Sequence, residues 1–242
     1  MTQKQPPAAV TFLSLGPGDP RQLTLQAADC LRRADAVLLP ATRSADGTTL
    51  SSRAADIITQ WCPPERLHPY PLPMSTQRQQ ALDVYDHIHD DALLAYRQGQ
   101  HVVVAVEGDA SVYASTHYVF DRLRRDGVPV EQMPGIPSFI AAAAMAGLSL
   151  ASQEQTLTVV PGNADAQRLR SLLDGGGTVV VMKLSRCQEA VKQLLLSNPD
   201  VVCHYFENVG TDRQFHTDCR DEIMGRRMPY FSIAVLTLST EN

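Results

Sequence analysis

The chain has 242 residues, which is long for one domain and suits two domains of about 100–130 residues each. Hydrophobic residues make up 44% and charged residues 19%, so the composition excludes a disordered chain and favours a globular protein with a real core. The net charge of −5 leaves no surplus of Lys and Arg to neutralise phosphates, which argues against a nucleic-acid partner.

Nothing in the sequence indicates a disulfide framework, a zinc site or a membrane anchor. The five cysteines are odd in number and never form a CxxC pair; they are Cys30, Cys62, Cys187, Cys203 and Cys219. The first ten residues lack the apolar core of a signal peptide, and no run approaches about 18 uninterrupted apolar residues. We therefore expect a cytoplasmic protein with reduced thiols and no bound metal.

The chain opens with the pattern of a parallel sheet. Ala8–Leu15 is apolar and β-branched, which predicts a strand. Leu23–Arg33 has apolar residues at helical spacing, with Thr24 as a candidate N-cap. Ala36–Leu39 predicts a second strand that ends at Pro40. A strand, turn, helix and strand in this order are typical of a parallel α/β unit.

Similar alternation continues to the end of the chain. Helices are predicted over 53–61, 77–98, 116–125, 139–146, 164–173 and 187–196. Strands are predicted over 101–106, 128–133, 156–160, 178–182 and 201–206, with a β-rich stretch over 229–238. We divide the chain into an N-terminal α/β domain, residues 1–130, and a C-terminal α/β domain, residues 131–242.

Three glycine-bearing loops follow predicted strands, and ligands of parallel sheets bind at such strand ends. Gly16-Pro17-Gly18-Asp19 lets the backbone approach a ligand, although an ordinary turn would have the same sequence, and it is neither a dinucleotide fingerprint nor a P-loop. Glu107-Gly108-Asp109 ends a buried strand, where an acidic side chain suits ribose hydroxyls or a cationic ligand. Pro134–Ser138 opens a helix. No serine lies in a GxSxG elbow, so no nucleophilic catalytic set is visible and the catalytic residues stay unknown.

The order of these loops resembles the tetrapyrrole (corrin/porphyrin) methylases. The resemblance covers Thr11 to about Leu238 and depends on three stretches, GPGD with LRRADAVLLP, VVVAVEGDASVYAST, and MPGIPSFIAAAAMAGLSL. Within that family, YPLPM at 70–74, VVVMK at 179–183 and MPYFS at 228–232 are similar to the branch that methylates carbon 20 of precorrin-2. A branch acting on cobalt-factor II would look the same.

The resemblance implies two α/β domains with a cleft between them for S-adenosyl-L-methionine, in a homodimer. Carried over by motif position, the cofactor-binding residues are Pro17, Glu107, Gly108, Asp109, Val112, Tyr113, Pro137, Ser138, Met182, His204 and Tyr230. Three positions depart from the family pattern. Ser14 replaces a glycine, Ala110 replaces the proline of GDP, and Pro137 replaces a serine or threonine.

The implied reaction is methyl transfer to carbon 20 of a small-molecule tetrapyrrole on the way to cobalamin. The electron-rich ring is itself the nucleophile, which agrees with the missing catalytic set. The carboxylates of the substrate need cationic side chains, and the candidates near the loops are Arg43, Arg78, Lys183 and Arg186.

Other functions remain open from the sequence. The same fold serves methyl transfer to another precorrin carbon, or to ribosomal RNA or diphthamide, and the acidic charge argues against RNA. A nicotinamide-dependent dehydrogenase would need GxGxxG after the first strand, where this chain has LGPGD. A non-catalytic binding module with the same fold is the third alternative.

Overall fold

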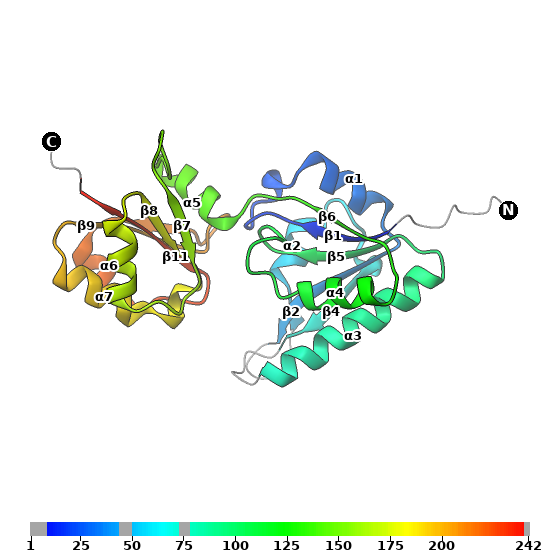
Figure 1. Cartoon of the computed structure of the whole chain (residues 1–242). Helices are drawn as coiled ribbons and strands as arrows, with labels where there is room; N and C mark the ends of the chain where they lie inside the picture. The colour runs from blue at the N-terminus through cyan, green and yellow to red at the C-terminus, as the bar shows by residue number, and fades with distance from the viewer. Residues whose placement is uncertain (1–8, 44–49, 73–77, 240–242) are drawn as a thin grey trace. The chain divides into compact units, whose positions relative to one another are not determined.

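The computed structural model describes residues 9–43, 50–72 and 78–239 (Figure 1). The chain divides into two compact units, Met1–Pro137 and Ser138–Asn242. The predicted division after residue 130 falls at the first residue of a strand that belongs to the first sheet. The observed division lies in the loop that follows this strand.

The first unit is built on a six-stranded sheet with the order β3-β2-β5-β1-β6, and β4 also pairs with β2. Its strands are β1 (Val10–Ser14), β2 (Ala36–Arg43), β3 (Leu50–Ser51), β4 (Leu67–Pro71), β5 (Val102–Val106) and β6 (Val130–Met133). All pairs are parallel except β2 with β3. The prediction of a parallel sheet is confirmed for this unit.

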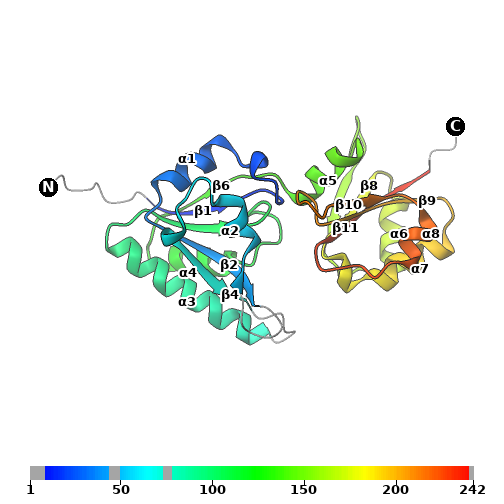
Figure 2. The same cartoon turned by 180° about the vertical axis from the view of Figure 1, so that it is seen from behind.

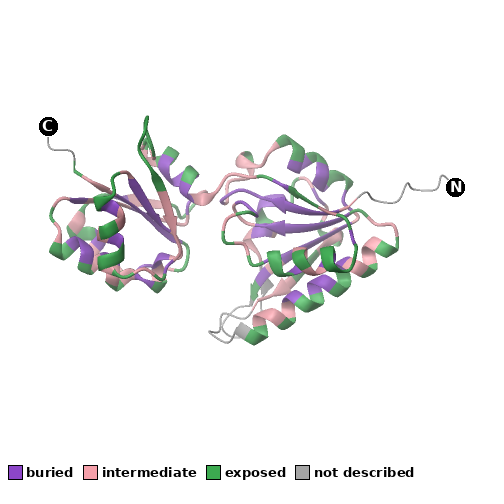
Figure 3. Cartoon of the chain, in the orientation of Figure 1, coloured by how far each residue is buried: buried purple, intermediate pink, exposed green. Residues whose placement is uncertain are grey.

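Helices cover both faces of this sheet (Figures 1 and 2). They are α1 (Leu25–Arg33), α2 (Arg53–Ile58), α3 (Arg78–Arg97) and α4 (His117–Arg125), with 3₁₀ turns η1 (Pro20–Gln22) and η2 (Pro64–Arg66). On one face α1 and α2 share a core with Leu13 and Val103, and on the other α3 and α4 share a core with Phe12 and Val104. Because both faces are covered, β1 and β5 are buried along their whole lengths, and β5 is apolar throughout (Figure 3).

The second unit contains a five-stranded mixed sheet with the order β10-β9-β11-β8-β7. Its strands are β7 (Leu157–Val160), β8 (Thr178–Val181), β9 (Val201–Glu207), β10 (Phe215–Thr217) and β11 (Ser232–Leu238). Its helices are α5 (Ser138–Ala146), α6 (Ala166–Asp174), η3 (Leu184–Arg186), α7 (Gln188–Ser197) and α8 (Arg220–Gly225). Only β7 and β8 are parallel, and the other pairs are antiparallel.

The core of the second unit lies between this sheet and three helices. Leu169 of α6, Val191 of α7 and Ile223 of α8 are fully buried in one cluster with Val181 and Tyr205 of the sheet. The helix α5 contacts β11. The chain therefore consists of two α/β units, as the sequence predicts.

One prediction about a proline needs correction. Pro40 does not end its strand, because β2 continues to Arg43. Beyond Leu38 the strand no longer pairs with β5, so the missing N–H of Pro40 removes no hydrogen bond to that neighbour. The proline-rich passage after α2 contains the strand β4, which among the described strands pairs with β2 alone and can therefore hold Pro69 and Pro71.

Candidate functional site

The first site element is a set of three loops at the carboxyl ends of β1, β5 and β6, which are neighbours in the sheet (Figure 1). The GPGD loop after β1 and the EGD loop after β5 are joined by their backbones. The Gly16 N–H donates to the Gly108 carbonyl at 3.0 Å, and the Gly108 N–H donates to the Gly16 carbonyl at 2.7 Å. Both glycines have a positive φ, +75° and +73°, which other residues rarely adopt. The sequence therefore folds these two loops into one surface.

Ser14 connects all three strand ends from inside. Its hydroxyl donates to the Met133 carbonyl of β6 at 2.7 Å and accepts from the Ala110 N–H at 2.9 Å. Ser14 is 1% exposed, so these bonds are shielded from water. The departure from the family glycine thus supplies a buried cross-link.

Asp109 holds the third loop against the second. One carboxylate oxygen accepts from the Gly135 N–H at 2.7 Å, and the other accepts from the N–H of Ser111 at 2.8 Å and from its hydroxyl. Burial alone raises the pKa of Asp109, but the hydrogen bonds from Ser111 and Gly135 outweigh it, so the pKa lies below its ordinary value. The carboxyl is thus kept ionised in a buried position.

The three loops approach one another most closely at Gly135. A Cβ atom at this position would lie 2.5 Å from the Ser14 Cβ and 2.9 Å from the Gly108 carbonyl oxygen. No side chain fits there, so the third loop can close on the first two only with glycine.

Glu107, the first residue of the EGD loop, forms an ion pair with a residue that lies outside the three loops. Its Oε2 lies 3.7 Å from Nε of Arg53 on α2, and the Arg53 Nη2 donates to the Pro17 carbonyl at 3.3 Å. Burial raises the pKa of Glu107, while the positive charge of Arg53 lowers it and the nearby Asp56 raises it. Sequence motifs did not single out Arg53, because its two contacts come from distant parts of the chain.

Val112 and Tyr113 continue the EGD loop. The Val112 N–H donates to the Asp109 carbonyl at 3.1 Å, which turns the chain. Tyr113 follows with φ of 52°, an uncommon conformation for an aromatic residue, and is 40% exposed. A strained, exposed aromatic beside a loop site is a feature of functional positions.

Three of the predicted residues in the second unit, Met182, Lys183 and Arg186, follow the strand β8. Met182 directly follows β8, and its N–H donates to the Val160 carbonyl of β7 at 2.9 Å. A Cβ on Gly162 would lie only 2.1 Å from the Lys183 carbonyl oxygen, so the loops after β7 and β8 touch through backbone. Lys183 has φ of 55°, and Arg186 closes the turn η3 with its N–H on the Lys183 carbonyl at 3.1 Å.

His204 lies on β9 and faces another histidine. Its Nδ1 is 3.2 Å from Nε2 of His216 on β10, and the two rings stack with centroids 5.5 Å apart. Burial lowers the pKa of His204, and His216 lowers it further, whereas Asp218 raises it. Tyr230 precedes β11, is 54% exposed and meets the Phe231 ring edge to face at 5.0 Å.

The four remaining predicted residues lie at the ends of secondary-structure elements or next to one. Pro137 is the last residue of the first unit, and Ser138 begins α5. Arg43 ends β2 and Arg78 begins α3, but their side chains lie outside the described part of the chain. The substrate role of these two arginines therefore stays a prediction.

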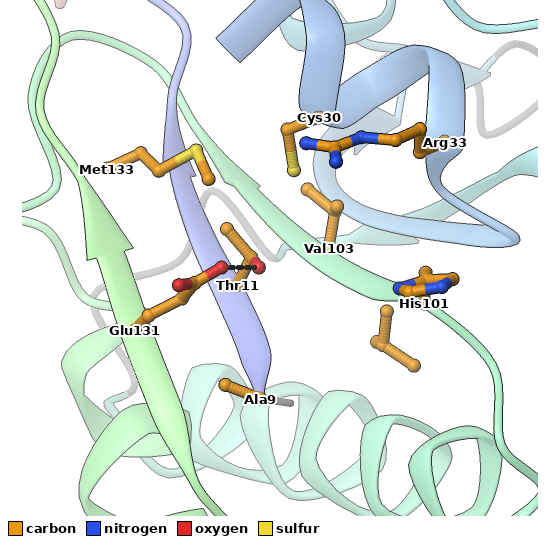
Figure 4. A pocket seen from close by; sticks show the side chains of 9 residues that line it. Ala9, Thr11, Cys30, Arg33, His101, Val103, Glu131 and Met133 are labelled. Carbon is orange, nitrogen blue, oxygen red and sulfur yellow. Dashed lines mark hydrogen bonds between the residues drawn. The ribbon is translucent and has the colours of Figure 1, made fainter. Parts of the chain in front are cut away.

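A separate cavity of about 210 Å³ lies over the first residues of β1 and β5 (Figure 4). Cys30 and Arg33 of α1 and Glu131 of β6 also line it, and Thr11 donates a hydrogen bond to Glu131 at 2.6 Å. None of the predicted site residues contributes to it.

Among residues 9–43, 50–72 and 78–239, no group of three or more His, Cys, Asp or Glu is arranged to hold a metal ion. In the same ranges no helix is long and apolar enough to cross a membrane.

Known proteins resemble this chain in sequence or in fold. A precorrin-2 C(20)-methyltransferase of Sinorhizobium sp is 28% identical over 233 residues, 91% of each chain. The cobalt-precorrin-2 C(20)-methyltransferase of Salmonella typhimurium is 26% identical over 233 residues, 95% of this chain and 96% of the relative. The solved uroporphyrin-III C-methyl transferase of Thermus thermophilus, complexed with S-adenosyl homocysteine, has the same fold. Its TM-score is 0.64 at 22% identity, over 95% of this chain and 97% of that one.

The sequence profile of the tetrapyrrole (corrin/porphyrin) methylases matches residues 9–220, which include all three loops of the first unit. The resemblance noted from the sequence is thereby confirmed. This chain belongs to the tetrapyrrole (corrin/porphyrin) methylases.

Proposed function

We propose that this chain transfers the methyl group of S-adenosyl-L-methionine to carbon 20 of precorrin-2 or cobalt-factor II in cobalamin biosynthesis. The observation that carries the proposal is the joined set of glycine loops at the ends of β1, β5 and β6 in a chain of the methylase family. The names of the relatives at 28% and 26% identity support carbon 20 as the position.

The residues of the first unit suit a cofactor with a cationic sulfonium and a ribose. The joined loops present backbone groups near Gly16 and Gly108, and Glu107 adds a carboxylate held by Arg53. Asp109 belongs to the proposed set as the residue that holds the loop, because Ser111 and Gly135 already occupy its oxygens. The full proposed set is Pro17, Glu107, Gly108, Asp109, Val112, Tyr113, Pro137, Ser138, Met182, His204 and Tyr230.

In this reaction the main task of the protein is to hold the cofactor and the tetrapyrrole in the correct relative orientation. S-adenosyl-L-methionine, when bound, supplies an electrophilic methyl group. The ring electrons would form the new carbon–carbon bond as the sulfur–methyl bond breaks, with its electron pair kept by the sulfur of S-adenosylhomocysteine. The meso proton would then pass to water or a base, so no activated Ser or Cys is needed. Orientation of bound reactants can supply on the order of 7–11 kcal/mol of the barrier. Lys183 and Arg186, on one turn, are proposed to bind substrate carboxylates together with Arg43 and Arg78.

A homodimer in the cytoplasm is part of the same proposal, by analogy with the family. Light scattering after size exclusion tests the dimer directly. A mass of two chains is expected, and a mass of one chain at micromolar concentration would remove this part of the proposal.

Calorimetric titration with S-adenosylhomocysteine tests the cofactor class, with NADH and GTP as controls. We expect micromolar binding of S-adenosylhomocysteine and no binding of either control. A folded protein that binds none of the three would contradict the proposal. A protein that binds S-adenosylhomocysteine but never transfers a methyl group would instead be the non-catalytic module.

A further inference from the structure

Arg53 is fixed in the fold by its neighbour Ser52. Ser52 is the N-cap of α2, since its hydroxyl accepts from the Ala55 N–H at 3.2 Å. The same hydroxyl donates to the Pro40 carbonyl of β2 at 2.6 Å. Arg53, the first residue of the helix, therefore starts from a backbone that is attached to the sheet.

From this position the guanidinium reaches two loops at once. Nη2 donates to the Pro17 carbonyl of the GPGD loop at 3.3 Å, and Nε lies 3.7 Å from the Glu107 carboxylate of the EGD loop. The two side chains are only 23% and 28% exposed. An ion pair that is mostly shielded from water is screened less by salt than a surface pair. The contact therefore holds the two loops in a way that a surface pair would not.

We propose that Arg53 is a positioning residue for cofactor binding, which keeps the Pro17 carbonyl and the Glu107 carboxylate at a fixed separation. The inference rests on the proposed function, because it assumes that these two loops hold the cofactor. Arginine is needed rather than lysine, since a planar guanidinium carries several donors in a rigid fork, whereas an ammonium is a single point charge.

The charge of Arg53 also acts on Glu107. Burial raises the pKa of Glu107, Arg53 opposes this effect, and Asp56 on the same helix adds to it. Without Arg53 the pKa of Glu107 moves further up, so the carboxyl takes up its proton at a higher pH. A structural role of Arg53 alone would not shift the pH at which cofactor affinity changes.

The test compares three variants of the full chain by titration with S-adenosylhomocysteine. Arg53→Met keeps an unbranched apolar stem and removes the charge, and Arg53→Lys keeps the charge and removes the fork. Arg66→Met is the matched control, because Arg66 also donates to a backbone carbonyl, that of Ala34 at 2.9 Å, but just before β2, at the amino ends of the parallel strands and opposite the loops. We expect the Kd to rise about tenfold for Arg53→Met, which corresponds to about 1.4 kcal/mol, with a smaller rise for Arg53→Lys and none for Arg66→Met.

Two further readouts separate positioning from folding. The loss of affinity on acidification should begin at a higher pH in Arg53→Met than in the wild type. In the Glu107→Gln background, Arg53→Met should weaken binding less than it does alone, since the two residues act as a pair. Wild-type affinity in both Arg53 variants, or equal losses in both backgrounds, would overturn the inference while leaving the proposed function intact. Failure of the wild type to bind would instead overturn the proposed function itself.

Discussion

The hydroxyl of Ser14 and the backbone N–H of Ala110 form a buried hydrogen bond of 2.9 Å between the ends of β1 and β5. By resemblance, the family has glycine at the first position and proline at the second. A proline at 110 would have no N–H to donate, and its ring would occupy the space of the hydrogen bond. The two departures from the family pattern therefore compensate each other, and both support the loop surface proposed to bind the cofactor.

A double-mutant cycle tests this compensation. Ser14→Gly alone leaves the Ala110 N–H and the Met133 carbonyl without their buried partner, which costs about 1–3 kcal/mol of unfolding free energy. Ala110→Pro alone forces the proline ring against the Ser14 hydroxyl. The double variant removes the unpaired N–H and the clash and leaves only the Met133 carbonyl without its donor, so we expect a coupling free energy of about 0.5–3 kcal/mol in urea unfolding. Single effects that add within about 0.5 kcal/mol would show that the two positions are independent.

Gly135→Ala should damage stability and binding together. The new Cβ would lie 2.5 Å from the Ser14 Cβ and 2.9 Å from the Gly108 carbonyl, so the third loop must move away from the other two. Overpacking of this kind costs about 1–3 kcal/mol. Gly225→Ala is the control, because a Cβ there meets nothing within 4 Å and the change should stay within about 0.5 kcal/mol. Equal thermal shifts in the two variants would contradict the close approach.

Asp109→Asn should destabilise the protein in a pH-dependent way. The pKa of Asp109 in the folded protein lies below its ordinary value of 3.8, so its contribution is fully present above that value and is lost as the pH falls through the native pKa. At neutral pH we expect a loss of about 1.5–3 kcal/mol, typical of hydrogen bonds to a charged group. Urea unfolding at a series of pH values checks this, and a difference between wild type and variant that persists unchanged to about pH 3 would contradict it.

Thiol labelling tests the burial of the cysteines. Four of the five are buried, and Cys219 is exposed. Burial raises the pKa of Cys30, Cys62 and Cys187, and raises that of Cys203 to about 12, so none of the four offers a thiolate at neutral pH. The folded protein should react with a disulfide reagent at Cys219 alone, with the other four labelled only in denaturant. Rapid labelling of a second thiol in the folded protein would mean that the hydrophobic core around that cysteine is accessible to the reagent, which would contradict its burial.

Local patterns predicted most of the elements. The helix α1 begins after Thr24, whose hydroxyl accepts from the Ala27 N–H at 3.1 Å, as the N-cap prediction requires. The buried run of β5 and its break at Glu107 are also confirmed. The strand β4 could not be predicted, because Pro69 and Pro71 disfavour a strand unless it lies at an edge, and edge position is a property of the whole sheet.

The cross-links of the site depend on contacts far apart in the chain. The GPGD and EGD loops could be recognised singly, but the bond between Ser14 and Ala110 joins residues that are distant in sequence and match no motif. Arg53 was missed for the same reason, since its partners Pro17 and Glu107 lie in the loops that follow two different strands. Asp109 was predicted as a cofactor ligand, and the structure adds that it holds the loop through Gly135.

The most direct test of the central claim is to determine which ring carbon receives the methyl group. The purified protein would be incubated with freshly prepared precorrin-2 and S-adenosylmethionine labelled with ¹³C in the methyl group, and the product examined by NMR. The account predicts one labelled methyl group per ring, at carbon 20, and a lower rate of labelling when Glu107→Gln and Arg53→Met are combined at limiting cofactor. A methyl group at another carbon, or no transfer by a protein that binds S-adenosylhomocysteine, would contradict it.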